Sequence, residues 1–217
     1  GMNKQSDRKG NSPMLDLFFT HKLRNRQKIE LNMVGQYSQS DYYNNLIYSD
    51  SENEWEYPTK VINNGYAVSG EAVYSKQFNR SEARIGLQYQ HNFASNDYVI
   101  YETQTEMTKD NTYLYCGIGG SISNNVMYSL GTGVKLFTVA DGIDTRRYVR
   151  NLSTALLFWR ISNSWSLTAT TYFVPSLPSL SDLSPVLQRV DDVEAIRGND
   201  ALKPSNTMNS TLRLQYN

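Results

Sequence analysis

The 217-residue sequence has little of what catalytic and metal-binding sites are usually built from. Its single cysteine, Cys116, excludes an internal disulfide framework and a thiolate zinc site. Its two histidines, His21 and His91, are distant in sequence and show no metal-ligand spacing. No Ser/His/Asp arrangement and no glycine-rich loop before a helix occurs either. We therefore predict a non-catalytic protein with no metal and no cofactor.

An excess of charge of one sign and long apolar runs are also missing. The 21 Lys and Arg residues balance 21 Asp and Glu residues, so no electrostatic field draws the chain to nucleic acid. No run of about 18 apolar residues exists, which excludes a transmembrane helix. Gly1-Met2 resembles an expression-tag scar, and the polar residues 3–11 that follow lack the apolar segment of a secretory signal. We expect residues 1–13 to be disordered.

What the sequence does contain is a repeated alternation of apolar and polar residues, which is typical of β-strands. In residues 28–37, for example, Ile29 and Leu31 alternate with Glu30 and Asn32. Similar runs lie at 66–78, 83–90, 165–173 and 208–216, and weaker ones at 14–23, 98–106, 112–120, 126–138 and 147–161. Residues 186–196 are ambiguous. The sequence predicts an all-β, antiparallel up-and-down meander of about ten long strands.

The connections between these runs are alternately short and long. Short ones lie near 24–27, 79–82, 121–125 and 162–164, and long ones near 38–65, 92–97, 107–111, 139–147 and 175–205. In a meander, successive connections lie at opposite ends of the strands, so one end has tight turns and the other has large loops. Most runs extend for about 9–13 residues, enough to cross a bilayer at a tilt. Both features are typical of an outer-membrane β-barrel.

Alternation alone does not decide which face of the sheet meets water. The apolar face turns inward in a soluble barrel and outward to lipid in a membrane barrel. The polar face is mostly Ser, Thr, Asn, Gln and Gly, which favours a barrel lumen over a soluble surface rich in Lys and Glu. We predict that residues 14–217 form part of a transmembrane-type β-barrel or a closed one. The alternative is a small autonomous β-barrel that binds a ligand or partner through its loops.

The 175–205 loop carries the most specific pattern. Residues 175–185 are rich in Pro, Ser and Leu, and residues 197–204 read Arg-Gly-Asn-Asp-Ala-Leu-Lys-Pro. This resembles the TonB-dependent receptor-like outer-membrane β-barrels, in which a Gly-Asn-Pro-x-Leu-Lys-Pro motif follows such a segment. The matching residues are Gly198, Asn199, Leu202, Lys203 and Pro204. We interpret the motif first as a turn that leads the loop back to the next strand, with Asn199 bonding its own backbone, and second as a ligand contact.

The resemblance implies a section of an uptake receptor in the outer membrane of a Gram-negative bacterium, in contact with membrane lipid. Such receptors have a plug and a barrel of about 22 strands. The chain would thus supply pore wall and outer loops, and would meet a TonB-type energy-coupling partner only through regions that it lacks. An open ten-stranded sheet has two unpaired edges, so an edge-strand dimer is a further expectation.

The 38–65 loop holds the candidate ligand contacts. Tyr42, Tyr43, Trp55 and Tyr57 place aromatic rings on this loop, where they can stack on a nutrient ligand of unknown type. They can equally pack on one another and order the loop. The acidic clusters Asp50, Glu52, Glu54 and Asp191, Asp192, Glu194 are interpreted as solvated loop charge, because the first lacks the glycine and distal glutamate of a calcium loop.

Overall fold

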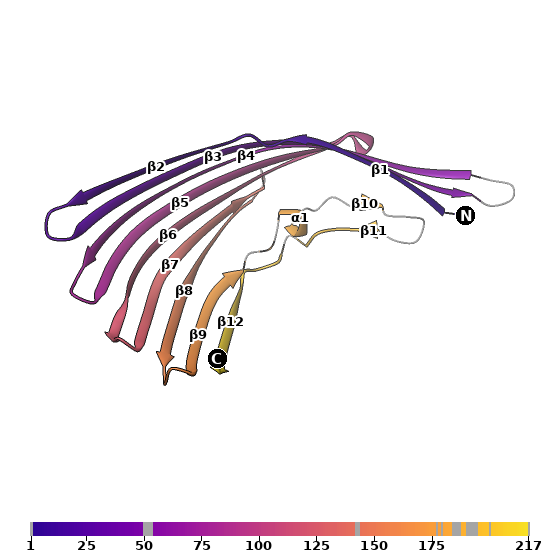
Figure 1. Ribbon diagram of the computed structural model, residues 1–217. Helices are drawn as coiled ribbons and strands as arrows, with labels where there is room; N and C mark the ends of the chain where they lie inside the picture. Colours follow the sequence, from indigo (N-terminus) through magenta and orange to yellow (C-terminus); the bar gives the residue numbers. More distant parts are fainter. Residues whose placement is uncertain are drawn as a thin grey trace.

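A computed structural model describes residues 2–49, 54–141, 144–176, 178, 180–183, 188–189, 195–199 and 201–216. Ten strands among these residues form one antiparallel sheet, and two short strands form a second sheet. Figure 1 shows the large sheet as a curved band with the short strands within its hollow. The predicted all-β antiparallel meander is therefore confirmed.

The elements of the described residues have the following bounds. The large sheet contains β1 (Met2–Asn11), β2 (Met14–Leu23), β3 (Gln27–Ser49), β4 (Glu54–Gln77), β5 (Ser81–Tyr98), β6 (Thr103–Ser123), β7 (Val126–Ala140), β8 (Thr145–Arg160), β9 (Trp165–Ser176) and β12 (Ser205–Tyr216). The small sheet pairs β10 (Gln188–Arg189) with β11 (Ala195–Ile196). The helical elements are η1 (Val99–Tyr101) and α1 (Leu180–Leu183).

Strands β3 to β9 lie side by side in chain order, and β12 pairs with β9. At the other edge, β2 pairs with the first half of β3 and β1 with the second half. Ser12 and Pro13 interrupt that edge, because proline has no amide hydrogen to donate to a ladder. Across the break the Tyr37 amide still donates to the Pro13 carbonyl at 3.1 Å. In the described residues the two edges do not meet, so the sheet is open.

The expected number of strands is found, but the set differs. Residues 2–11 form β1 and are not disordered, because they pair with the far half of β3. Residues 103–123 form one strand across the expected loop 107–111, and the expected loop 92–97 belongs to β5. The expected loop 38–65 is mostly the extended hairpin of β3 and β4. In all these places side-chain alternation weakens while the ladder of backbone hydrogen bonds continues.

The predicted asymmetry of the connections holds for only one of the expected long connections. Four residues separate β3 from β4, β5 from β6 and β7 from β8, and only the connection from β9 to β12 is much longer. The turns after β2, β4, β6 and β8 span two to four residues at one end of the sheet. In the first of them Asn25 and Arg26 have φ of 60° and 58°, the left-handed pair that a tight hairpin turn requires. At the other end, the segment between β9 and β12 carries α1, β10 and β11. Residues 50–53 and 142–143 lie outside the described residues.

The two faces of the sheet differ sharply in polarity. One cross-strand row of apolar residues consists of Leu31, Ala72, Leu87, Leu114 and Val134. These side chains are exposed, with Leu87 at 49% and Leu114 at 54% of their full surface. The buried apolar cluster found in the described residues holds only Met107, Val139 and Leu183. We call the apolar face the lipid face, because an extended exposed apolar surface of this kind is typical of a sheet that meets lipid.

The opposite face, called the polar face, is stiffened by a tyrosine over a glycine. A Cβ atom at Gly86 would collide with the ring of Tyr115 on the next strand. The Tyr115 ring stacks on Tyr113, with 4.9 Å between the ring centroids. Its hydroxyl donates to Glu71 Oε1 on β4 at 2.7 Å. The tyrosine therefore ties β4, β5 and β6 together where the missing side chain of Gly86 leaves room.

We expect Gly86→Ala to lower the free energy of unfolding by about 1–3 kcal/mol, the usual cost of overpacking. The added methyl would displace the Tyr115 ring and its hydrogen bond to Glu71. Urea unfolding in detergent micelles, followed by tryptophan fluorescence, measures the change. Gly35→Ala is the matched control, because a Cβ at Gly35 has nothing within 4 Å. Equal effects of the two substitutions would contradict the proposed role of Tyr115 in tying β4, β5 and β6 together.

A second pair of variants tests which face meets lipid. Leu87 and Gln88 are neighbours on β5 and point to opposite faces. We expect Leu87→Lys to cost about 2–4 kcal/mol of folding free energy in a bilayer, because it places an ammonium group in hydrocarbon. Gln88→Lys should fold as the parent does. The fraction of each variant that inserts into liposomes is measured from its heat-dependent gel mobility. Equal insertion of the two variants would contradict the assignment of the lipid face.

Candidate ligand-binding surface

Aromatic side chains bound the apolar band of the lipid face at two levels. At the outer level, Tyr37, Tyr66 and Phe93 form one cross-strand row, and the last two rings stack at 5.3 Å. At the inner level, Trp165 and Tyr216 pack with 5.0 Å between ring centroids. On β4, Tyr66 to Tyr74 covers about 26 Å along the strand, or roughly 20 Å of height at the usual tilt. This is close to the roughly 25 Å apolar band of a transmembrane barrel.

Polar groups on the lipid face gather at the outer aromatic level. The Tyr89 hydroxyl donates to Asp110 Oδ1 at 2.6 Å, and His91 Nδ1 lies 2.8 Å from the same oxygen. The His91 ring also packs against Tyr66 at 5.5 Å. These contacts suit the headgroup level of a bilayer, where amphipathic rings and charges concentrate. In the described residues no group of three metal-ligating side chains is found.

The hairpin of β3 and β4 carries the four aromatic residues predicted to contact a ligand. Strand alternation from the known register places Tyr42, Trp55 and Tyr57 on the polar face and Tyr43 on the lipid face. Trp55 is 44% exposed and Tyr43 40% exposed. The structure thus brings three of the four candidates to one side of the hairpin and separates the fourth. Asp50 and Glu52 of the neighbouring acidic cluster lie outside the described residues, as do Asp191, Asp192 and Glu194.

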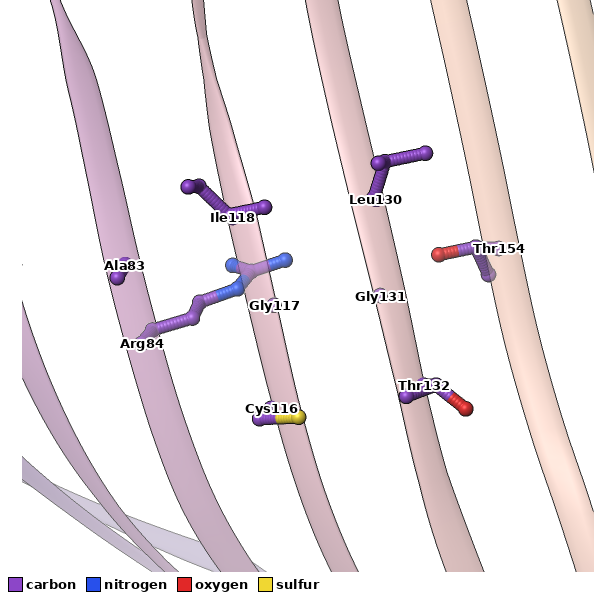
Figure 2. Close-up of a pocket in the computed structure, with 9 residues that line it drawn as sticks. All are labelled: Ala83, Arg84, Cys116, Gly117, Ile118, Leu130, Gly131, Thr132 and Thr154. Carbon is purple, nitrogen blue, oxygen red and sulfur yellow. The ribbon is translucent and has the colours of Figure 1, made fainter.

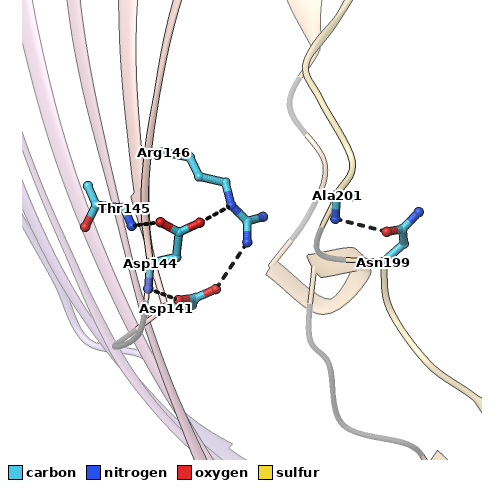
Figure 3. A network of polar contacts seen from close by, with 6 residues as sticks. All are labelled: Asp141, Asp144, Thr145, Arg146, Asn199 and Ala201. Carbon is cyan, nitrogen blue, oxygen red and sulfur yellow. Dashed lines mark hydrogen bonds and ion pairs between the residues drawn. The ribbon is translucent and has the colours of Figure 1, made fainter.

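The loop motif forms a turn beside α1. The Ala201 amide donates to Asn199 Oδ1 at 2.9 Å (Figure 3), and the Asn199 amide donates to the Asp182 carbonyl at 2.7 Å. Pro204 is buried at the start of β12, whereas Leu202 and Lys203 are exposed. Asn199 therefore makes the backbone contact that was inferred for it from the sequence, and the turn leads the chain into β12.

The segment between β9 and β12 packs on the polar face. Leu183 of α1 lies buried with Met107 of β6 and Val139 of β7. The Arg150 guanidinium donates to the Pro204 carbonyl at 3.5 Å. Because the ribbon of α1 lies within the hollow of the curved sheet (Figure 1), the polar face is the concave one.

A hollow of about 450 Å³ lies between β5 and β8 (Figure 2), where Gly117 and Gly131 are paired across β6 and β7. Arg84 Nε lies 3.4 Å from where a Cβ of Gly117 would be, and Thr154 Oγ1 lies 3.0 Å from that of Gly131. Sequence reasoning missed this hollow. Paired glycines inside strands were the available signal, since they mark a close approach of another group.

Comparison with solved structures places this sheet among known receptor barrels. FpvA of P. aeruginosa in complex with a heterologous pyoverdine matches with a TM-score of 0.72 and 12% identity, over 94% of this chain and 30% of that one. The ferric-catecholate import receptor Fiu of E. coli K12 matches with a TM-score of 0.67 and 9% identity, over 96% and 38%. The copper transporter OprC matches with a TM-score of 0.62 and 12% identity, over 96% and 43%. These are TonB-dependent receptors.

The chain has the fold of a section of a TonB-dependent receptor barrel. It spans well under half the length of each of those three proteins. No family model matches the sequence, and no curated protein matches it. At identities this low, the likeness establishes the fold alone.

The receptor-barrel fold explains why the convex face of the sheet is apolar and the concave face polar. In a barrel wall the convex side meets lipid and the concave side lines the lumen. The exposed apolar row of Leu31, Leu87 and Leu114 lies on the convex side, whereas Glu71, Tyr115 and Arg84 lie on the concave side. The described residues include no helix with the length and hydrophobicity that a bilayer crossing requires.

The turn at Asn199 gives a testable prediction for this receptor-barrel section. We expect Asn199→Ala to remove the hydrogen bond to Ala201, which costs about 1 kcal/mol and raises local opening about fivefold. Trypsin should then cut after Arg197 about five times faster. Asn209→Ala, in exposed β12, is the control and should leave the rate unchanged. An unchanged rate in Asn199→Ala would show that the turn does not hold the loop.

Proposed function

We propose that the chain is a non-catalytic section of an outer-membrane uptake receptor, supplying lumen wall and outer loops. The observation that carries this proposal is the exposed apolar band on the convex face, bounded by aromatic side chains at both levels. A soluble barrel would bury that band instead. The likeness to receptor and transporter barrels supports the same assignment.

The proposal carries a location with it. A sheet with this lipid face belongs in the outer membrane of a Gram-negative bacterium, with its tight turns toward the periplasm and its long hairpin outside. The open edges at β2 and β12 would be paired by further strands, or by a second copy of the chain in an edge-strand dimer. Coupling to a TonB-type partner would pass through regions of the receptor outside this sheet.

We place the first ligand contact at the tip of the β3–β4 hairpin. Trp55, Tyr57 and Tyr42 share the polar face there, which continues inward as the concave wall. Aromatic rings at a rim offer flat apolar surfaces to a passing nutrient at low entropic cost. The proteins compared above carry different cargoes, namely a pyoverdine, a ferric catecholate and copper, so their likeness favours no one ligand class. The Asn199 motif has the role of shaping the loop.

We expect Trp55→Ala combined with Tyr57→Ala to reduce uptake at least about tenfold, because two stacking surfaces are lost. The assay uses a deletion strain complemented with each variant, grown on the nutrient whose uptake the deletion abolishes. Tyr43→Ala is the matched control, since Tyr43 lies on the same hairpin but faces the other way. Outer-membrane levels are compared by immunoblotting. Wild-type uptake in the double variant would assign these rings to packing within the hairpin.

A further inference from the structure

Three cations on the concave face have no acidic partner among the residues that the structure describes. Lys135 of β7 and Arg150 of β8 lie directly opposite each other in the ladder. Like charges in directly opposed positions destabilise a sheet. Lys109 of β6 lies opposite Val139, on the same face as Lys135 and four residues from it along β7. None of the ion pairs found among the described residues includes Lys109, Lys135 or Arg150.

Two other cations on this face do have acidic partners. Lys28 pairs with Glu30 at 2.9 Å on β3. Arg146 Nε lies 3.1 Å from Asp144 Oδ2 and its Nη2 lies 3.6 Å from Asp141 Oδ2. Figure 3 draws both contacts. Some cations of this face thus have a carboxylate partner, whereas the opposed pair Lys135 and Arg150 has none among the described residues. A locally unfavourable arrangement of this kind is commonly retained for function.

The side chains of Lys135 and Arg150 are held in place. Lys135 Nζ lies 5.1 Å from the Tyr113 ring centroid and 6.0 Å from that of Phe137, which is fully buried. Arg150 Nη1 donates a hydrogen bond to the carbonyl of its neighbour Val149 at 2.9 Å, and Nη2 donates a longer one to the Pro204 carbonyl at 3.5 Å. Its Nε is buried and has no hydrogen-bond partner in the structure. The guanidinium thus keeps donor capacity that the described residues do not satisfy.

We propose that Lys109, Lys135 and Arg150 form a binding site for an oxyanion group, carboxylate, sulfate or phosphate, of the transported ligand. The inference rests on the proposed function and deepens it. A guanidinium and an ammonium group from directly opposed positions on neighbouring strands can bind one oxyanion through charge-assisted hydrogen bonds. An anion between Lys135 and Arg150 also removes the repulsion that the ladder otherwise imposes.

The position of the site favours a ligand that enters from outside. Lys109 lies in the cross-strand row of Ala67, next to the outer aromatic level at Tyr66. Lys135 lies further inward, in the row of Glu71. The cations thus follow the concave wall inward, on the face that Tyr42, Trp55 and Tyr57 share at the rim. An acidic ligand would meet the rings first and the charges next.

Sulfate binding by the purified protein in detergent micelles tests the site. The probes are sodium sulfate, phosphate and acetate, each added at constant ionic strength set with sodium chloride so that screening does not change. The readout is the shift of the melting temperature with anion concentration. We expect stabilisation of the parent, and an apparent sulfate Kd at least about tenfold weaker in Lys135→Gln/Arg150→Gln. A parent response retained by the double variant would overturn the proposal.

Two further variants keep the result interpretable. Arg213→Gln removes an exposed cation from the same face of β12 and should leave the sulfate response unchanged. An equal loss there would show non-specific charge. Lys135→Gln alone retains Arg150 and should raise the melting temperature without sulfate, because it relieves the like-charge pair. A lower melting temperature without sulfate in this single variant would overturn the argument from repulsion.

A further set of variants tests whether the site binds a ligand or carboxylates of the chain itself. If carboxylates of residues 191–194 fill the site, Asp191→Asn/Asp192→Asn/Glu194→Gln should tighten sulfate binding, and the ligand assignment fails. If sulfate binding is unchanged, the site is open to a ligand. The two proposals fail in different experiments. If the proposed uptake function is wrong, Trp55→Ala/Tyr57→Ala leaves uptake unchanged. If only the anion site is wrong, that double variant still reduces uptake, but the protein shows no specific sulfate response.

Discussion

The continuous backbone ladder is the constraint on which the structure depends. In hydrocarbon, each unpaired amide or carbonyl costs several kcal/mol, so a membrane-crossing sheet must pair its strands without gaps. Here β3 and β4 pair residue by residue from Gln27 to Ser49, without a register shift. Because the ladder and the lipid face supply the stability, the sheet needs only a small buried apolar cluster. The concave face is then free to carry polar and charged residues.

Side-chain alternation predicted the strands where a bilayer enforces it and missed them elsewhere. The run 14–23 coincides with β2, which carries exposed Leu15, Leu17 and Phe19. Alternation fades in residues 92–97 and 107–111, although both lie inside strands. Beyond the aromatic level no face has to be apolar, so the sequence loses its period while the backbone bonds persist. Alternation therefore marks the part of each strand that lies within the apolar band, not the whole strand.

The candidate site was accessible from sequence only in part. Asn199 was recognisable because an asparagine turn is a local device, and its contact with Ala201 is local. The separation of Tyr43 from Tyr42 follows from alternation once residues 38–49 are known to be strand, but the sequence suggested a loop. Three different strands carry Lys109, Lys135 and Arg150, and only the register of those strands places them on the same face. A shift of one residue would move any of them to the other face.

Tyr113 contacts both Lys135 of the proposed anion site and Tyr115, the residue that ties β4, β5 and β6 together. Its ring stacks on Tyr115, which is fixed by Glu71 and by the space over Gly86. The same Tyr113 ring lies under the Lys135 ammonium group. A repelling cation pair can keep a defined geometry only if something other than mutual attraction orients it, and this stack supplies that support. The most strongly held part of the concave face thus adjoins its least compensated charges, which is the arrangement that a preorganised anion site requires.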